Sequence, residues 1–129
     1  MSDLKEILSA LSEELRLRIL MLLCDSSLRV NCFILIFQLP QSTISRHLSV
    51  LRKSGLVKVA RDCTNNYYTI NTEEPFGKLK ERLIGTYCQA LKDVKPFKSD
   101  LKRLRELKAQ CTADCQTHIH VHTFIDKEE

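Results

Sequence analysis

Apolar side chains recur every three or four residues along much of the chain, which is the spacing of amphipathic helices. The pattern predicts a first helix over residues 2–11, with Ser2 as its N-cap, and a second over residues 13–23, with Ser12 as its N-cap. The apolar run at residues 28–37 is rich in β-branched and aromatic side chains, so its periodicity alone fits either a strand or a helix.

The segment QSTISRHLSVLRKSGLV, residues 41–57, has the pattern of a helix with one polar face. Apolar residues mark its inner side, Pro40 suits its start, and Gly55 is a good C-terminal stop. At 100° per residue, the opposite side collects hydroxyl and basic side chains. These are Ser42, Ser45, Arg46, Ser49 and Lys53. We therefore predict an exposed helix face on which every charge is positive.

Two short strands follow this helix. Residues 56–61 (LVKVAR) alternate apolar and basic side chains, residues 62–65 supply turn formers, and residues 66–71 (NYYTIN) are aromatic and β-branched, so a hairpin is expected. Five basic residues and no acidic one lie between positions 41 and 61, in a chain whose net charge is +4. A solvated basic face without a partner would explain the charge alone. The succession of helix, turn, basic helix and basic hairpin instead favours a winged helix-turn-helix that binds double-stranded DNA.

The last third of the chain predicts two more helices. The first, between Pro75 and Pro96, carries a continuous apolar stripe. The stripe consists of Phe76, Leu79, Leu83, Tyr87, Ala90 and Val94. A DNA-binding half cannot cover it alone, and the first helix offers a matching stripe, so we expect a two-fold homodimer. A further helix starts at Phe97. We divide the chain into a DNA-binding and dimerisation domain at 1–110 and a Cys- and His-bearing tail at 111–129.

Several segments together resemble a known family. LSEELRLRILMLL, LPQSTISRHLSVLRKSGLV and NYYTI are similar to the arsenic-repressor (ArsR) family of winged-helix, metal-sensing transcriptional repressors, and the likeness runs from about residue 4 to residue 110. The resemblance implies a homodimer that binds an inverted-repeat operator and leaves it when an inducer binds. It also assigns NCFILIF, residues 31–37, to the first helix of the motif, which periodicity left open.

The resemblance also assigns roles to individual residues. It places the residues that contact bases and phosphates on the second motif helix, namely Gln41, Ser42, Thr43, Ser45 and Arg46, with Ser49 and Lys53 on the same outward face. It places Lys58 and Arg61 on the wing. His47 matches the family's histidine beside that serine and arginine, but it leans toward the apolar side of the helix, so we interpret it as a packed or hydrogen-bonded structural residue.

Composition and the absence of certain motifs narrow the classes of protein to which the chain could belong. Apolar residues make up 43% and charged residues 28%, as in ordinary globular proteins. No apolar run approaches the roughly 20 residues that a membrane helix needs, and no secretory signal is visible at the N-terminus, so we expect a cytoplasmic protein. No glycine-rich phosphate loop and no motif of a nucleophile with its base is present, so we expect no enzyme.

Six cysteines remain to be assigned. Cys24 and Cys88 lie in apolar helical segments, where we expect small buried thiols. Cys111 and Cys115 are four residues apart, so both thiols share a face if the helix continues, and they can bind one ion or simply pack. His118, His120 and His122 alternate with apolar residues and could add imidazole ligands, or could belong to a disordered end.

These ligand types predict an inorganic effector. Soft thiolates suit arsenite or antimonite, our first choice of inducer, and also cadmium or zinc. Many arsenic-responsive relatives carry Cys-Val-Cys at the start of the first motif helix, where this chain has Arg29, Val30 and Asn31, so that inducer site is missing. A third donor for arsenic would have to be Cys32, Cys88 or a thiol of the other subunit. The alternatives are a repressor of the same fold that senses thiol oxidation and a metal-buffering protein that does not bind DNA.

Overall fold

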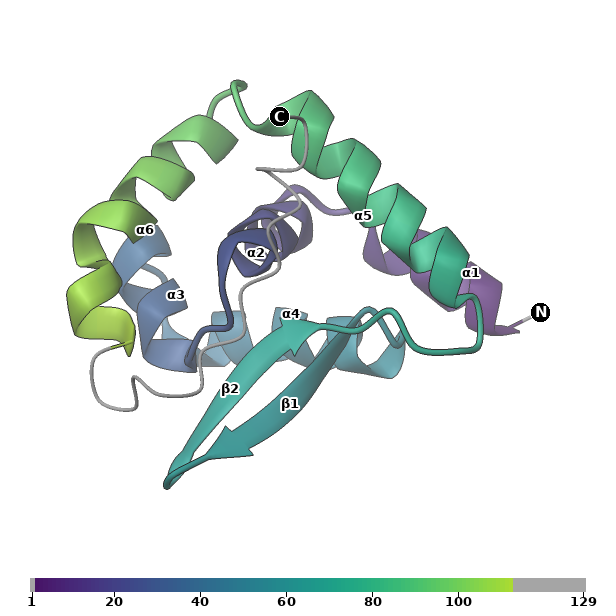
Figure 1. Ribbon diagram of the computed structural model, residues 1–129, viewed down its shortest axis with the longest axis horizontal. Helices are drawn as coiled ribbons and strands as arrows, with labels where there is room; N and C mark the ends of the chain where they lie inside the picture. The colour runs from purple at the N-terminus through teal and green to yellow at the C-terminus, as the bar shows by residue number, and fades with distance from the viewer. Residues whose placement is uncertain (1, 113–129) are drawn as a thin grey trace.

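A computed structural model describes residues 2–112 as six helices and one hairpin. The elements are α1 (Ser2–Ala10), α2 (Glu14–Asp25), α3 (Val30–Phe37), α4 (Gln41–Lys53), β1 (Val57–Asp62), β2 (Asn65–Ile70), α5 (Gly77–Leu91) and α6 (Phe97–Thr112). The arrangement is mainly helical, with a winged helix-turn-helix formed by α3, α4 and the hairpin, as the sequence predicts. Figure 1 shows α5 and α6 meeting at an angle on one side of α2, while the hairpin extends away on the other side.

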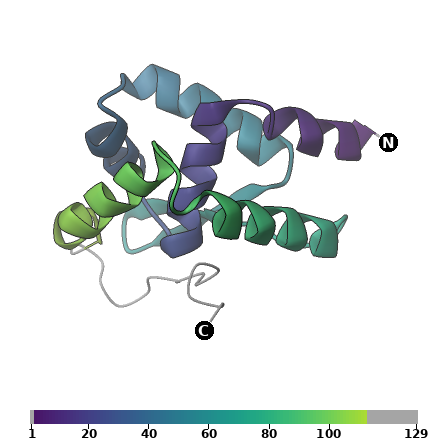
Figure 2. The same cartoon turned by 90° about the horizontal axis from the view of Figure 1, so that it is seen from above.

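The core forms around α2. Six consecutive residues of this helix, Ile19 to Cys24, are buried. A helix that is buried on all sides needs neighbours on all sides. α2 contacts α4, α5, α6 and the second strand. Figure 2 shows α2 and the helices around it from above, turned by 90° from the view of Figure 1.

The segment that periodicity left open is helical. α3 buries Cys32, Phe33 and Ile36, and it ends at Gln38, whose φ of 57° lies in the left-handed region. This conformation stops the helix, and Leu39 and Pro40 lead directly into α4. The motif therefore has its short turn where the resemblance placed it.

The wing is a two-stranded antiparallel hairpin. Its register pairs Val57 with Ile70 at the base and Asp62 with Asn65 next to the turn. Leu28 adds a single bridge to Tyr68, with backbone hydrogen bonds in both directions. The base of the hairpin is thereby fixed to the segment that precedes α3.

α6 packs against α2 and α3 and is held by polar contacts as well as apolar ones. Arg18 of α2 donates two hydrogen bonds, of 2.7 and 2.9 Å, to the carboxylate of Asp100, which is 1% exposed. The hydrogen bond and the charge of Asp100 raise the pKa of Arg18 above its ordinary value, against the opposing effect of burial. Arg103 donates to the carbonyl of Ile36 at 2.6 Å. α6 is thus tied to α3, the first helix of the helix-turn-helix.

Two expectations about local structure are wrong. Ser12 does not cap α2, because its hydroxyl donates to the carbonyl of Ser9 while Glu13 is the N-cap. α5 ends at Leu91, so Val94 lies beyond the helix and is 44% exposed. α5 also buries a face within the chain, and it is a different face from the apolar stripe that we predict for the dimer. The buried face consists of Gly77, Lys80, Ile84 and Cys88.

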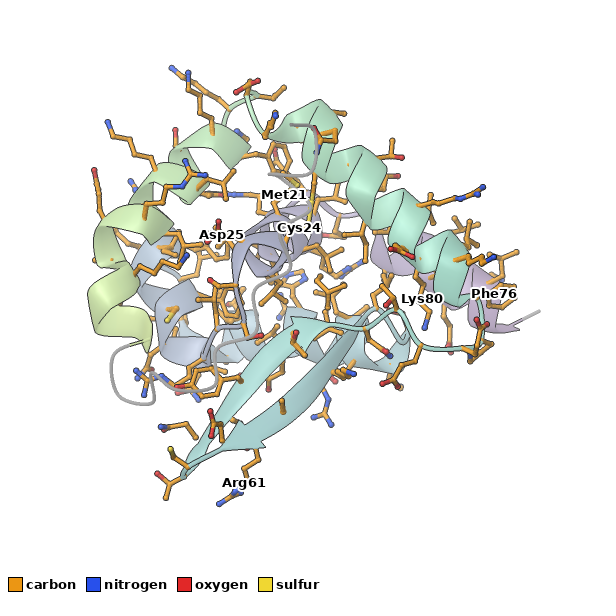
Figure 3. All side chains as sticks on the ribbon, viewed as in Figure 1. Met21, Cys24, Asp25, Arg61, Phe76 and Lys80 are labelled. Atoms are coloured by element: carbon orange, nitrogen blue, oxygen red, sulfur yellow. A yellow bond between two sulfur atoms is a disulfide. The ribbon has the colours of Figure 1, made fainter. Side chains whose placement is uncertain are left out.

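Cys24 and Cys88 are buried, as expected, but they are not separate thiols. They form a disulfide that joins α2 to α5. Figure 3 labels Cys24 beside Met21, on the α2 side of this contact. None of the helices within residues 2–112 is both long enough and apolar enough to span a bilayer.

Candidate nucleic-acid interface

The outward face of α4 and the first strand of the hairpin carry the side chains that the sequence assigned to DNA. Eight of the nine predicted residues are exposed, and Thr43 is half-buried. The exposed ones are Gln41, Ser42, Ser45, Arg46, Ser49, Lys53, Lys58 and Arg61. The opposite face of α4 is buried through Ile44, Leu48 and Leu51, which fixes the rotation of the helix about its axis. The basic face is therefore held outward by packing on its other side.

A hollow of about 370 Å³ lies between α4 and the hairpin. It is lined by Ser45, Ser49, Arg52, Lys53 and Tyr68. Hydroxyl and cationic groups are the usual donors to DNA phosphates, so this hollow suits a backbone phosphate between the recognition helix and the wing. Arg52 and Tyr68 were not among the predicted contacts. Arg52 is one of the five basic residues between positions 41 and 61, so the sequence could have indicated it. Tyr68 lies beside the hollow only because of the register of the hairpin.

His47 has a structural role, as predicted. Its ring is nearly buried, and Nδ1 lies 3.2 Å from a guanidinium nitrogen of Arg16. Burial lowers the pKa of His47, and the charges of Arg16 and Arg46 lower it further. A neutral ring can accept a hydrogen bond from Arg16, which in turn donates to the carbonyl of Ala10 at 2.7 Å. His47 thus connects α4 to the end of α1.

The two predicted wing residues differ in their surroundings. Lys58 forms a salt bridge of 2.7 Å with Glu73, and this hydrogen bond and charge lower the pKa of Glu73. Arg61 is exposed next to the turn, and Figure 3 shows it projecting from the far end of the hairpin. Arg61 is therefore the better placed of the two to reach a phosphate beyond the major groove.

A second group of basic side chains lies away from the wing. It lines a hollow of about 500 Å³ at the corner between α5 and α6. The lining includes Lys92, Lys95, Lys98, Lys102 and Arg105, together with Asp93. Figure 1 shows this corner on the opposite side of the molecule from the hairpin. This hollow is therefore separate from the one between α4 and the hairpin.

The candidate metal ligands are not brought together within the described residues. Cys32 is fully buried in α3, and the sulfur of Cys88 is bonded to Cys24. Neither presents an accessible thiolate to an ion in this form. Cys111 falls in the last turn of α6, but its side chain, Cys115 and the three predicted histidines lie outside the described part. Within the described part, no three His, Cys, Asp or Glu side chains gather as a metal site.

Known proteins share this arrangement. A family model described as bacterial regulatory protein, arsR family, matches residues 13–59. The chain is 37% identical over 84 residues to the transcriptional activator HlyU of Vibrio cholerae, and the match covers 65% of this chain and 77% of HlyU. It is 36% identical over 75 residues to the arsenical resistance operon repressor of Bacillus subtilis, covering 57% of this chain and 71% of that one.

Solved structures agree with the sequence matches. HlyU from Vibrio cholerae gives a TM-score of 0.55 at 33% identity, covering 68% of this chain and 95% of that one. A structure described as reduced HlyU from the same organism gives 0.54 at 33% identity, covering 68% and 92%. These relatives are regulators of transcription and not enzymes. From the shared motif and the share of each relative that is covered, the chain belongs to the arsR family of bacterial transcriptional regulators.

Proposed function

We propose that this regulator is a cytoplasmic repressor that binds an inverted-repeat operator as a homodimer and is released by an agent that acts on its thiols. The outward basic face of α4 supports the first part of the proposal. Arg46 can donate two hydrogen bonds to guanine, Gln41 can both donate to and accept from adenine in the major groove, and the hollow beside Arg52 suits a phosphate.

The homodimer rests on apolar surface that the chain leaves uncovered. Leu8 of α1 is 53% exposed. On α5, Leu79, Leu83 and Tyr87 are only half-buried. Pairing α1 and α5 with those of a second copy would cover this surface. A two-fold dimer would then place two copies of α4 about 34 Å apart, one turn of DNA, which is why we expect an inverted repeat.

The disulfide between Cys24 and Cys88 favours thiol oxidation as the signal. Disulfides are rare in reducing compartments, where those that form are mostly catalytic or redox-sensing. This one joins α2, at the centre of the DNA-binding half, to α5, the helix that we assign to the dimer. Its formation or reduction can therefore change how the two DNA-binding halves sit in the dimer. That one HlyU structure is described as reduced is consistent with this reading.

Arsenite or antimonite at Cys111 and Cys115 is the second candidate, as an effector and not as a resident cofactor. Its support is the chemistry of two thiols four residues apart, and the likeness to an arsenical resistance operon repressor. A divalent ion such as zinc or cadmium would use the same thiols with His118, His120 or His122. In both cases the tail would sense the ion, and the disulfide would be separate from sensing.

The test is a titration of fluorescent DNA, observed by anisotropy. A duplex is first selected from a random pool by the reduced wild-type protein. Binding is then measured with dithiothreitol, with peroxide, and with arsenite, antimonite, zinc or cadmium under reducing conditions. We expect peroxide to weaken binding at least fivefold and Cys88→Ser to abolish that response, a coupling of about 1 kcal/mol or more.

Two matched variants separate the candidates. Cys32→Ser, another buried cysteine, should respond to peroxide as the wild type does. If arsenite or antimonite releases DNA while peroxide does not, and Cys111→Ser with Cys115→Ser abolishes release, the second candidate replaces the first. Failure of the reduced protein to select any duplex would contradict the repressor function itself.

A further inference from the structure

Lys80 is a buried lysine whose charge has no place in the DNA contacts described above. It is 2% exposed, although it lies on α5 between exposed Lys78 and Arg82 in the sequence. Its ammonium donates a hydrogen bond of 3.1 Å to the carbonyl of Gly55. Removing an ammonium from water is costly unless it is paired, and an apolar side chain would fill the position without that cost. The contact with Gly55 is therefore a specific feature of this chain.

Gly55 is the residue at which the recognition helix ends. Its φ of 84° is left-handed, and its N–H donates to Arg52 while that of Leu56 donates to Leu51, as in a Schellman cap. These bonds turn the chain out of α4 and directly into β1. The carbonyl of Gly55 thus lies at the joint between recognition helix and wing. A cation is also favoured there by the negative end of the helix dipole.

A second donor reaches the same oxygen. The side-chain amide of Asn71, just after β2, donates to the carbonyl of Gly55 at 2.9 Å, and the backbone N–H of Asn71 donates to Leu56 at 2.9 Å. One carbonyl oxygen therefore joins the end of α4, the end of the hairpin and α5. Figure 3 labels Lys80 where α5 passes the base of the hairpin.

We propose that Lys80 is a positioning residue for DNA recognition: through the carbonyl of Gly55, it fixes the angle between α4 and the wing so that both fit one duplex. The inference rests on the proposed DNA binding. Phosphate contacts hold the protein on any duplex, whereas base contacts carry the sequence information and require side chains aligned with the base edges in the groove. Loss of the ammonium should therefore reduce selectivity for a sequence more than affinity for DNA in general.

The experiment measures the ratio of dissociation constants for a random duplex and for the duplex selected by the wild-type protein, at one salt concentration. Lys80→Met removes the charge and the donor while keeping the length. Asn71→Ala removes the other donor to the same oxygen. Lys78→Met, on the exposed side of α5, is the control for loss of one positive charge. Urea unfolding measures the stability of each variant and shows which variants are folded under the conditions of the binding measurement.

We expect Lys80→Met and Asn71→Ala each to lower the ratio about tenfold, the effect of roughly one lost base contact, while Lys78→Met stays within about twofold of the wild type. If Lys80→Met does not fold, Asn71→Ala decides alone. An unchanged ratio, or equal weakening on both duplexes, overturns the role of Lys80. A wild-type protein that does not discriminate between the duplexes would contradict the proposed function instead.

Discussion

At the scale of the residue, the basic side chains of the DNA face differ in whether they already form a salt bridge within the chain. Lys58 is paired with Glu73 at 2.7 Å, in a surface position where such a pair contributes little to stability. Arg46 is exposed on the face of α4 that packing holds outward. Of the two, Arg46 is therefore expected to contribute more to binding, because Lys58 must give up an existing partner.

Arg46→Ala should weaken binding to the selected duplex by roughly 1–3 kcal/mol, since it removes a donor to a base edge or a phosphate. Lys58→Ala should weaken binding to all duplexes alike, and by less, because Glu73 offsets part of its charge. Anisotropy titrations over a range of salt concentrations measure both effects. Equal affinity of the wild type and Arg46→Ala for the selected duplex would contradict the assignment.

His47 predicts a pH dependence of stability. Because its folded pKa is lowered, the unfolded chain binds more protons than the native protein between that pKa and about 6.5. Stability should therefore fall as the pH drops below about 6.5, and the loss should be complete below the folded pKa. Urea unfolding at pH 7.5 and pH 5.5 measures this loss, which His47→Gln should reduce. A loss of equal size in His47→Gln would assign the effect to other groups.

The residue scale also shows where the sequence was insufficient. The exposed face of α4 followed from helical periodicity alone, since apolar and polar positions separate cleanly there. Lys80 could not be recognised in the same way, because a lysine between Lys78 and Arg82 has the pattern of a solvated residue. Tyr68 likewise reaches the hollow beside Arg52 through a strand register that no local pattern specifies.

At the scale of the element, α6 is attached to the DNA-binding half by two ion pairs of different burial. The carboxylate of Asp100 is 2% exposed and Arg18 is 24% exposed, whereas Lys108 and Asp25 are 38% and 16% exposed. Arg18 also lies over the ring of Phe37, 4.9 Å from its centroid. The pair at Asp100 is thus the stronger connection between α2, α3 and α6.

Arg18→Met should lower the free energy of unfolding by about 3 kcal/mol, the low end for breaking a buried pair, because Asp100 is left buried without its partner and Arg18 is only partly desolvated. Lys108→Ala, its matched control at a more exposed pair, should cost less than about 1 kcal/mol. Urea unfolding measures both. Similar costs for the two variants would show that burial does not distinguish these pairs.

The helices and strands also differ in how well the sequence predicts them. The hairpin and α4 were located from composition and alternation, with β1 and β2 within a residue or two of their observed bounds. α3 was settled only by the family resemblance, because its apolar run carries no helical or strand periodicity of its own. The N-cap at Ser12 failed because a serine hydroxyl can bond equally well to the preceding turn.

At the scale of the whole molecule, the disulfide joins cysteines 64 residues apart in sequence. Such a pairing has no local signature, so the sequence predicts only packed thiols for two cysteines in apolar helices. The link closes a loop that contains the recognition helix and the wing. Reduction of this disulfide therefore removes a constraint on the unfolded chain and also a covalent link between α2 and α5 in the folded protein.

Dithiothreitol should lower the free energy of unfolding of the oxidised protein by about 2–4 kcal/mol, because cross-linking a long loop restricts the unfolded chain. The same treatment should lower the stability of Cys24→Ser by less, because that variant lacks this link. Urea unfolding with and without dithiothreitol measures the difference. Equal stability in both conditions would mean that the link contributes nothing to the fold.

The central claim, that α4 and the hairpin meet DNA, is tested most directly by hydrogen–deuterium exchange of the full chain with and without the selected duplex. The protein carries a second basic hollow at the corner of α5 and α6, on the opposite side of the molecule. We predict slower exchange on DNA binding at residues 41–53 and 57–70, with no change at residues 97–108. Protection confined to residues 92–105, with α4 unaffected, would contradict the account.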